Sequence, residues 1–276
     1  MTTKYVVVFD LDETLGNFEQ LSLFWSITNS LCNNELNNEH FNFIIDNNKE
    51  ILRYKIIQLL NILKKKKQAK KCDGILIYTN NNGENSWANY IKDYFHYKLN
   101  YKLFDQIIRA YKIDNKKVEP NRTSHDKSYK DFVNCTTFDY NTKVCFLDDR
   151  IHKHMKHNNV TYIKLDPYYY NFNYIKACNN FYDQYNSLFK CSYNTYKNSF
   201  AKCHVLNTKN INFDYANDYT KIITTFNSFF NKTKNNMKPK TIKNKNNNKN
   251  KQIAHRRITA QTSKSSLNKT AKKLIN

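Results

Sequence analysis

The sequence predicts an α/β protein with a parallel β-sheet, and two kinds of segment lead to this prediction. Short apolar runs of strand length recur along the chain, and the first two are Tyr5–Phe9 and Gly74–Tyr78. Strands that are apolar on both faces are typical of parallel sheets covered by helices. Longer stretches with apolar residues at helical spacing separate these runs, which is the alternation expected of βαβ units.

Composition favours one folded domain followed by a charged tail. The chain has 276 residues, of which 40% are apolar and 15% aromatic, enough for a sizeable core. The formal net charge of +22 is unevenly spread, because residues 231–276 hold 14 of the 45 Lys and Arg residues and no Asp or Glu. We therefore expect a domain over residues 1–230 and a disordered basic tail over residues 231–276.

The cysteines and the apolar runs indicate an intracellular protein. The seven cysteines are odd in number and scattered, with no CxxC pair, which favours reduced thiols over a disulfide framework or a zinc site. The first apolar run is too short for a signal peptide, and no stretch reaches membrane-spanning length. We expect a soluble cytoplasmic or nuclear protein that is not secreted and has no membrane partner. The oligomeric state is left open.

The first half of the chain predicts helices between two strands. After the first strand, helical spacing covers residues 18–31, a polar loop follows over 33–40, and a second helix begins near residue 41. Residues 17–48 would form a small helical insert. Residues 49–70 then predict one long amphipathic helix that ends in lysines, as the helix dipole favours.

The second half predicts three more strands. The expected elements are a helix over 86–97, a strand over 104–111, a charged loop over 112–123, a helix over 124–135 capped by Ser124, and strands over 144–147 and 160–165. Residues 168–230 are rich in Tyr, Phe and Asn at helical spacing. We expect this region to form helices that pack back onto the sheet.

Three of the predicted strands end in polar side chains. Asp10 and Asp12 follow the first strand, Thr79 follows the second, and Asp148 with Asp149 follows residues 144–147. Ligands of parallel sheets bind beyond the carboxyl ends of the strands, so these groups are expected at one edge. Four carboxylates in one crevice repel one another unless a cation lies among them. Mg²⁺ suits such oxygen ligands, especially beside a substrate phosphate.

These motifs resemble those of the haloacid dehalogenase (HAD) superfamily of phosphohydrolases. The sequence DLDET at residues 10–14, the apolar strand ending in Thr79, a downstream lysine and the pair Asp148–Asp149 occur in the order of that superfamily. The form DLDETL and the stretch SHDKSYKDF are closer to the branch that acts on the RNA polymerase C-terminal domain, including the NLI-interacting-factor-like proteins. The resemblance covers about the first 165 residues and implies a Rossmann-like sheet.

The resemblance implies an aspartyl-phosphate mechanism. Asp10 would attack phosphorus and bind Mg²⁺, and Asp12 would act as acid and base with a raised pKa while its backbone carbonyl binds the metal. Thr79 would donate to the phosphoryl oxygens. Asp149 would be the remaining metal ligand, with Asp148 behind it.

Two lysines compete for the role of the motif lysine. Lys127 follows Ser124 closely, and its separation from Asp148 along the chain suits the superfamily in general. Lys130 begins KDF, which matches the Lys-Asp-Leu segment of the closer branch. On one helix the two would share a face. We favour Lys127.

Other polar and aromatic clusters have simpler explanations. His152, His154 and His157 do not share a helical face and lack a fourth ligand, so an exposed basic surface is favoured over zinc. His125 could contact the phosphate site, but an exposed helix start explains it equally well. The aromatic residues of 168–196 favour core packing over stacking on nucleic-acid bases.

The sequence thus predicts a Mg²⁺-dependent phosphatase, with a phosphoprotein carrying phosphoserine or phosphothreonine as the expected substrate. One alternative is a phosphatase of nucleotides or nucleic-acid ends, which the basic tail would suit. Another is a catalytically silent HAD-type module that binds nucleic acid through residues 231–276. The tail would bind such a polyanion in a salt-dependent manner.

Overall fold

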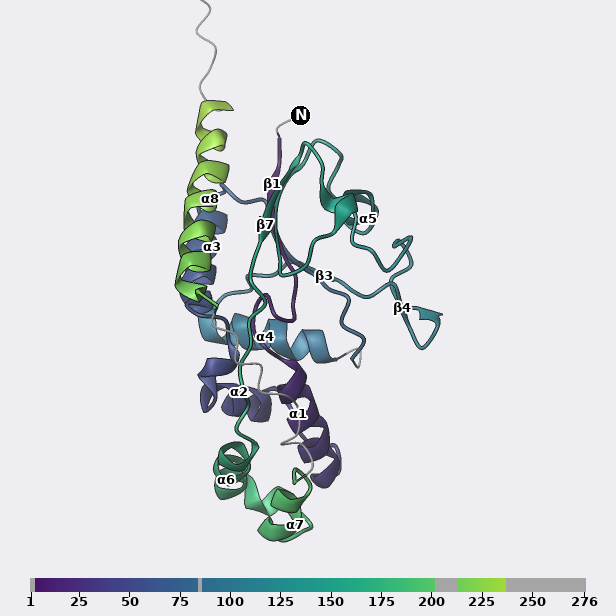
Figure 1. Ribbon diagram of the computed structural model, residues 1–276, viewed down its shortest axis with the longest axis vertical. Coiled ribbons are helices and arrows are strands. Elements are labelled where there is room, and N and C mark those ends of the chain that lie inside the picture. The colour runs from purple at the N-terminus through teal and green to yellow at the C-terminus, as the bar shows by residue number, and fades with distance from the viewer. Residues whose placement is uncertain (1–2, 84–85, 202–212, 237–276) are drawn as a thin grey trace, which may run out of the picture. The chain divides into compact units, whose positions relative to one another are not determined.

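A five-stranded parallel sheet organises the computed structural model, in the order β3-β2-β1-β6-β7 (Figure 1). The strands are β1 (Tyr5–Phe9), β2 (Gly74–Tyr78), β3 (Gln106–Ile108), β6 (Lys143–Asp148) and β7 (Val160–Lys164). In the register of the sheet, Phe9 of β1 pairs with Ile77 on one side and Leu147 on the other. The polar residues that follow these three strands therefore leave the sheet at the same level.

The structure describes residues 3–83, 86–201 and 213–236, all within one compact unit, Met1–Lys238. The predicted tail falls mainly on residues 237–276, which lie outside the described residues. Helix α8 (Tyr215–Asn236) runs past residue 231, so the predicted start of the tail is wrong by several residues. The apolar positions of its described part continue to Phe229 and Phe230, which are buried.

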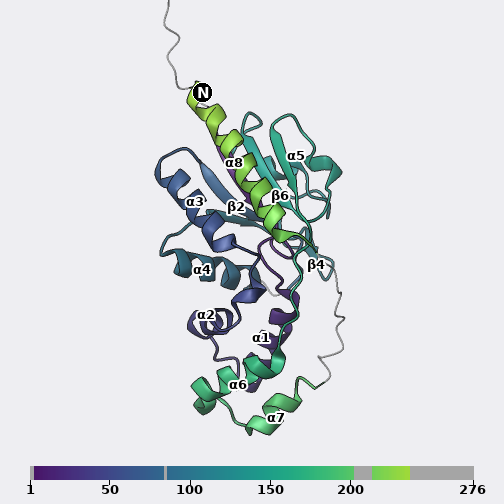
Figure 2. The ribbon, with the colours of Figure 1, turned by 60° about the vertical axis from the view of Figure 1, so that its left-hand side comes forward.

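The two faces of the sheet bury alternate residues of β1. Val6 and Val8 belong to a cluster with Phe132 of α5 (Tyr129–Asn134). Val7 and Phe9 belong to the larger core on the opposite face. There α3 (Ile56–Gln68), α4 (Trp87–Leu99) and α8 contribute side chains, and α3 and α8 lie side by side (Figures 1 and 2). This alternation is what a strand buried on both faces requires.

A second group of helices lies beyond the carboxyl edge of the sheet (Figure 2). It combines α1 (Glu19–Leu31) and α2 (Asn38–Asp46) with α6 (Tyr174–Tyr185), the short helix η3 (Asn186–Leu188) and α7 (Tyr193–Asn198). The hydroxyls of Thr28 and Tyr196 are 2.9 Å apart, and the rings of Phe24 and Phe200 stack with centroids 5.2 Å apart. Of the helices predicted to pack back onto the sheet, α6 and α7 instead cover the insert, and α8 contacts the sheet.

The predicted long helix over 49–70 is interrupted. A short 3₁₀ helix, η1 (Lys49–Ile51), is followed by α3, which begins at Ile56 after Lys55 with φ of 56°. The break between them brings the side chain of Arg53 into the interior, where it is only 3% exposed. Tertiary hydrogen bonds of this side chain outweigh the helical preference of the local sequence.

Two further predictions differ in their boundaries. The helix predicted over 124–135 begins at Tyr129, because Ser128 rather than Ser124 caps it, accepting a hydrogen bond of 3.0 Å from the backbone of Asp131. The strand predicted over 104–111 is limited to β3. Within the predicted charged loop, β4 (Lys112–Ile113) and β5 (Lys116–Lys117) form a small antiparallel hairpin.

Gly16 lets the loop after β1 approach the η1 segment. The backbone of Asn17 donates to the carbonyl of Ile51 at 2.8 Å, and that of Arg53 donates to Leu15 at 3.1 Å. A Cβ atom at Gly16 would lie 2.7 Å from the same Ile51 carbonyl oxygen, closer than any side chain tolerates. Only glycine permits this contact.

Arg53 ties the loop after β1 to the C-terminal part of the chain. Its guanidinium donates to the carbonyls of Thr14 and Glu13, each at 2.7 Å, and to that of Asp166 at 2.5 Å. It also forms a buried salt bridge of 3.0 Å with Asp218 of α8. Four segments distant in sequence therefore meet at one side chain.

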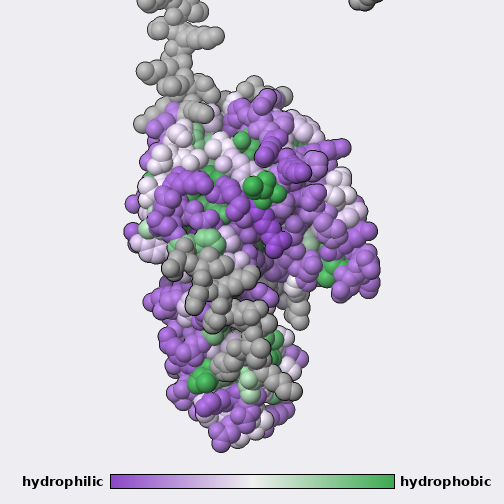
Figure 3. Space-filling view, viewed as in Figure 1, coloured by the Kyte–Doolittle hydropathy of each residue, from purple (hydrophilic) through white to green (hydrophobic). Residues whose placement is uncertain are grey.

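The visible surface is mainly hydrophilic (Figure 3). Hydrophilic residues cover most of the coloured surface in Figure 3, with apolar residues singly or in small groups. The six cysteines in the described part of the chain carry thiols rather than disulfides. Within the same part, no helix combines the length and apolar character needed to cross a bilayer.

Replacing Arg53 by methionine tests this junction. Arg53→Met should lower the free energy of unfolding by about 3–5 kcal/mol, because it leaves the buried Asp218 carboxylate without its partner. Adding Asp218→Leu should recover part of the loss. Urea denaturation measures both, with exposed Lys176→Met of α6 as control, expected within about 0.5 kcal/mol of the wild type. A cost for Arg53→Met equal to that of the control would contradict the role assigned here.

Candidate active site

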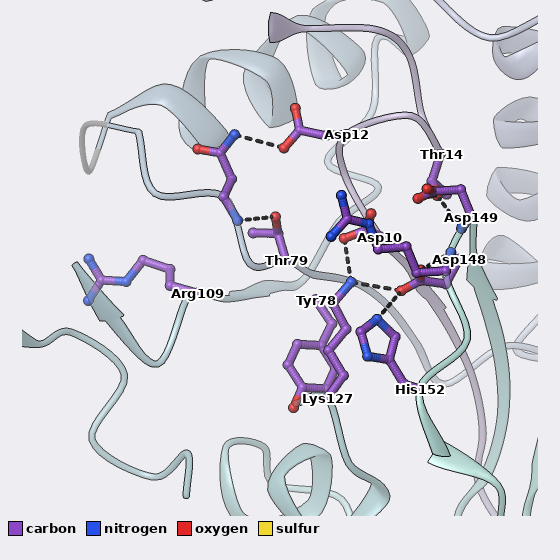
Figure 4. Close-up of polar contacts among 12 residues, drawn as sticks. Asp10, Asp12, Thr14, Tyr78, Thr79, Arg109, Lys127, Asp148, Asp149 and His152 are labelled. Carbon is purple, nitrogen blue, oxygen red and sulfur yellow. Dashed lines mark hydrogen bonds and ion pairs between the residues drawn. The ribbon is translucent and has the colours of Figure 1, made fainter. Parts of the chain in front are cut away.

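A polar cavity of about 230 Å³ opens at the carboxyl ends of β1, β2 and β6. Its lining includes all six residues that the sequence singled out: Asp10, Asp12, Thr79, Lys127, Asp148 and Asp149. Figure 4 shows these side chains converging from different strands and loops. The register of the sheet explains the convergence, since the three strand ends are adjacent.

Lys127 lies between two carboxylates at the base of the cavity. Its Nζ donates to Asp10 Oδ1 and, at 2.8 Å, to Asp148 Oδ2. The lysine is 2% exposed, so its charge is held away from water. Burial acts to lower the pKa of Lys127, but the two carboxylates outweigh it and raise that pKa. Lys127 is therefore a permanent cation at this position.

The two carboxylates bound by Lys127 differ in electrostatics. Burial raises the pKa of Asp10 above its usual value, against the opposing effect of Lys127. Burial also acts on Asp148, but there Lys127 and the hydrogen bond from His152 prevail and lower the pKa. His152 Nε2 lies 3.3 Å from Asp148 Oδ2, and the backbone of Arg150 donates to Asp148 Oδ1 at 2.7 Å. Asp148 is thus held as an anion.

The negative charge of Asp149 is less well stabilised than that of Asp148. Thr14 donates its hydroxyl to Asp149 Oδ1 at 3.3 Å and accepts from the Asp149 backbone at 3.1 Å. Burial, together with the charges of Asp10 and Asp148, raises the pKa of Asp149 to about 7. A nearby cation would remove this penalty.

The donor set fits a small divalent cation. Asp10, Asp148 and Asp149 each offer a carboxylate oxygen, and these oxygens lie within 4.8 Å of one another. Mg²⁺ holds its ligands at about 2.0–2.1 Å, so oxygens on opposite sides of the ion are about 4 Å apart. Burial, together with the neighbouring carboxylates, raises the pKa of Asp10 and of Asp149, and a bound cation would oppose this effect. Hard oxygen ligands with this charge suit Mg²⁺ better than a softer metal.

Asp12 lies apart from that group and has a different environment. Its Oδ2 accepts a hydrogen bond of 2.7 Å from the side-chain amide of Asn81. Burial raises the pKa of Asp12 to about 6, despite this hydrogen bond. The Asn81 backbone donates to Thr79 Oγ1 at 2.9 Å, which leaves the Thr79 hydroxyl hydrogen available to a ligand.

The structure places the two competing lysines in different surroundings. Lys127 precedes α5 and points into the cavity, whereas Lys130 is exposed on α5 and lines a separate cavity. The expectation that they share a helical face is wrong, because the helix begins only at Tyr129.

The histidines also separate. His154 and His157 are exposed, as expected, but His152 is half-buried and lines the cavity, which corrects its assignment to the exposed surface. His125 is exposed, yet it precedes α5 and lies outside the lining of this cavity. Among the described residues, Asp10, Asp148 and Asp149 are the only group of three or more potential metal ligands close enough to share an ion.

Comparison with known proteins adds no assignment. No family model, no curated protein and no solved structure matches this chain.

Four residues of the site were missed at the level of sequence. Asn81 orients Asp12, Thr14 orients Asp149, His152 contacts Asp148, and Arg53 holds the loop that carries Thr14. Thr14 had a signal, since it is the last residue of DLDET. The contacts of Asn81 and Arg53 join positions far apart in the chain, and the contact of His152 with Asp148 depends on the direction of the loop after β6.

The acidic cluster predicts a dependence of stability on pH and metal. Because the pKa of Asp149 is raised from its usual 3.8 to about 7, the folded protein binds more protons than the unfolded chain between these values. Without metal, stability should therefore fall as pH rises from about 4 to about 7 and level off above that value. Excess Mg²⁺ at the higher pH should restore it, with about 2–4 °C in melting temperature for each kcal/mol recovered.

Calorimetry with EDTA or Mg²⁺ measures these shifts. Asp149→Asn should show a smaller fall with pH and a smaller gain from Mg²⁺, because the group that titrates is gone. Exposed Asp183→Asn of α6 is the matched control and should behave as the wild type. Equal pH profiles for Asp149→Asn and the wild type would contradict the assignment of this pH dependence to Asp149.

Proposed function

We propose that this protein is a HAD-type, Mg²⁺-dependent phosphomonoester hydrolase that works through an aspartyl-phosphate on Asp10. The observation that carries the proposal is the convergence of Asp10, Lys127 and the Asp148–Asp149 pair in one cavity, with Asp12 held apart. A carboxylate in contact with a lysine ammonium can attack a phosphoryl group, because that ammonium and a bound cation would offset the negative charge of the phosphoryl oxygens. The resemblance of residues 10–14 to the DxDxT motif supports the same chemistry.

In the first step a carboxylate oxygen of Asp10 forms a bond to phosphorus while the bond to the leaving oxygen breaks. Asp12 donates its proton to that leaving oxygen. The pKa of about 6 for Asp12 keeps part of the population protonated near neutral pH, as a general acid requires. Asn81 fixes the direction of the Asp12 side chain.

In the second step a water attacks phosphorus and gives its proton to Asp12. The bond between phosphorus and Asp10 breaks, which releases inorganic phosphate and restores both aspartates. Throughout, the Lys127 ammonium and the Thr79 hydroxyl are available to the phosphoryl oxygens. Asp10, Asp148 and Asp149 would hold Mg²⁺, which supplies positive charge to the transferring phosphoryl group.

For the substrate we propose phosphoserine or phosphothreonine in a protein, on the resemblance of DLDETL to the branch that acts on phosphorylated polypeptide tails. A panel of phosphopeptides, nucleotides and 3′-phosphorylated oligonucleotides tests this class. The phosphopeptides should give the highest kcat/KM. Preference for an oligonucleotide would replace the protein substrate by a nucleic-acid end while keeping the mechanism.

The two aspartates give distinct outcomes when replaced. Asp10→Asn should lower kcat on an aryl phosphate roughly 10³-fold or more, because the nucleophile is lost. Asp12→Asn should accumulate phosphoenzyme, because an aryl leaving group needs little proton donation but the second step lacks its base. Quenched samples analysed by mass spectrometry would show one added phosphoryl group on the peptide that contains Asp10.

The control is again Asp183→Asn, which should keep the wild-type rate. No turnover by the wild type on any phosphomonoester, with the fold intact by circular dichroism, would instead favour the catalytically silent module. Turnover that survives in Asp10→Asn would refute the assigned nucleophile.

A further inference from the structure

A second cavity, of about 390 Å³, lies beside α5 and is larger than the candidate active site. Its lining is made of Thr123, Ser124, Ser128, Tyr129, Lys130, Tyr140, His154 and His157. The loops that supply Lys127 and His152 to the first cavity supply five of these residues, α5 supplies Tyr129 and Lys130, and Tyr140 precedes β6. Neither the proposed mechanism nor its metal uses any of the eight side chains.

The charge of this cavity is opposite to that of the first. Lys130, His154 and His157 line it, and its described lining contains no carboxylate. Among the described residues, no salt bridge joins Lys130 to an acid. The nearby Asp139 is engaged locally, since its carboxylate accepts from the backbone of Asn141 at 2.9 Å. An anion is the ligand that this set of donors suits.

The two histidines differ in how they are held. His157 stacks on Tyr129 with centroids 4.2 Å apart and an angle of 19° between the rings. Its Nδ1 accepts from the Asn159 backbone at 3.1 Å, so the remaining nitrogen, Nε2, carries the hydrogen and can donate. His154 belongs to the short helix η2 (Lys153–Met155), which is anchored by fully buried Met155.

An exposed aromatic ring adds a second kind of contact. Tyr140 is 52% exposed, although its backbone carbonyl accepts hydrogen bonds from Tyr129 at 3.1 Å and Asn159 at 2.6 Å. These hydrogen bonds hold the backbone of Tyr140 in place, while its ring is open to solvent. An aromatic side chain next to basic groups is the arrangement on which single-stranded nucleic acids stack their bases.

We propose that this cavity binds a nucleotide unit, with its phosphate at Lys130, His154 and His157 and its base on Tyr140. A phosphate alone would leave the aromatic ring and much of the volume unused, whereas a nucleotide joins a phosphate and a flat base in one unit. The unit is either a free nucleotide or part of a single strand, and the experiment separates these sources.

The test uses the full chain and an oligonucleotide of about ten residues with hydroxyl groups at both ends. This probe carries no phosphomonoester, so the result is independent of the proposed hydrolase activity. Binding is followed by fluorescence anisotropy over a range of salt, and the imidazole signals of His154 and His157 are followed by NMR. AMP and a phosphopeptide are titrated in parallel.

Two variants should separate the phosphate contact from the base contact. Lys130→Ala should weaken binding and reduce the slope of log K against log salt by about 0.7, the value for one phosphate of a single strand. Tyr140→Ala should weaken binding roughly 5- to 150-fold without changing that slope. Tyr140→Phe should retain the affinity, because it keeps the ring.

The control for charge is Lys176→Ala on α6, which removes one exposed lysine far from this cavity in sequence. Equal effects of Lys130→Ala and Lys176→Ala, or unchanged imidazole signals on binding, would overturn the site and assign binding to general charge, including the lysine-rich residues 237–276. A shift of the imidazole signals by AMP as strong as by the oligonucleotide would identify a free nucleotide as the ligand. A stronger response to the phosphopeptide would overturn the nucleotide assignment.

Discussion

The interaction on which the site depends is the buried contact of the Lys127 ammonium with Asp10 and Asp148. Two carboxylates cannot be buried side by side without a cation, because desolvation and mutual repulsion would force protons onto them. With Lys127 in place, Asp148 stays charged while Asp10 retains a raised pKa. Lys127 thus neutralises part of the negative charge of the cluster. The rest is neutralised either by a bound cation or by protonation of a carboxylate.

The strands and the acidic site followed from the sequence because local pattern decides them. A run such as Tyr5–Phe9 can be buried on both faces only within a covered sheet, and parallel strands place their carboxyl ends together. The choice between Lys127 and Lys130 could be stated but not decided, since it depends on where α5 begins. Ser124 and Ser128 are both of a residue type that caps helices, and in the structure Ser128 is the cap.

Other features could not be predicted because they are set by contacts between distant segments. Residues 49–70 read as one helix, yet four hydrogen bonds of Arg53 interrupt it. The aromatic residues after 168 were expected on the sheet, but apolar spacing does not specify which surface a helix covers. In the structure, Phe172 and Phe200 of this region pack against Phe24 of the insert instead. His152 illustrates the same limit, because its role depends on the direction of a loop.

The junction at Arg53 also has a consequence for protein synthesis. Asp10 and Arg53 leave the ribosome early, but Asp218, the acidic partner of Arg53, is 165 residues further along the chain. At about 5–20 residues per second, translation separates the two by roughly 8–33 s. During that interval the loop after β1 lacks one of its anchors, so the nascent chain carries the acidic residues before it can hold them in place. Helix α8, the last described element to be synthesised, therefore supplies the final anchor of the Arg53 junction.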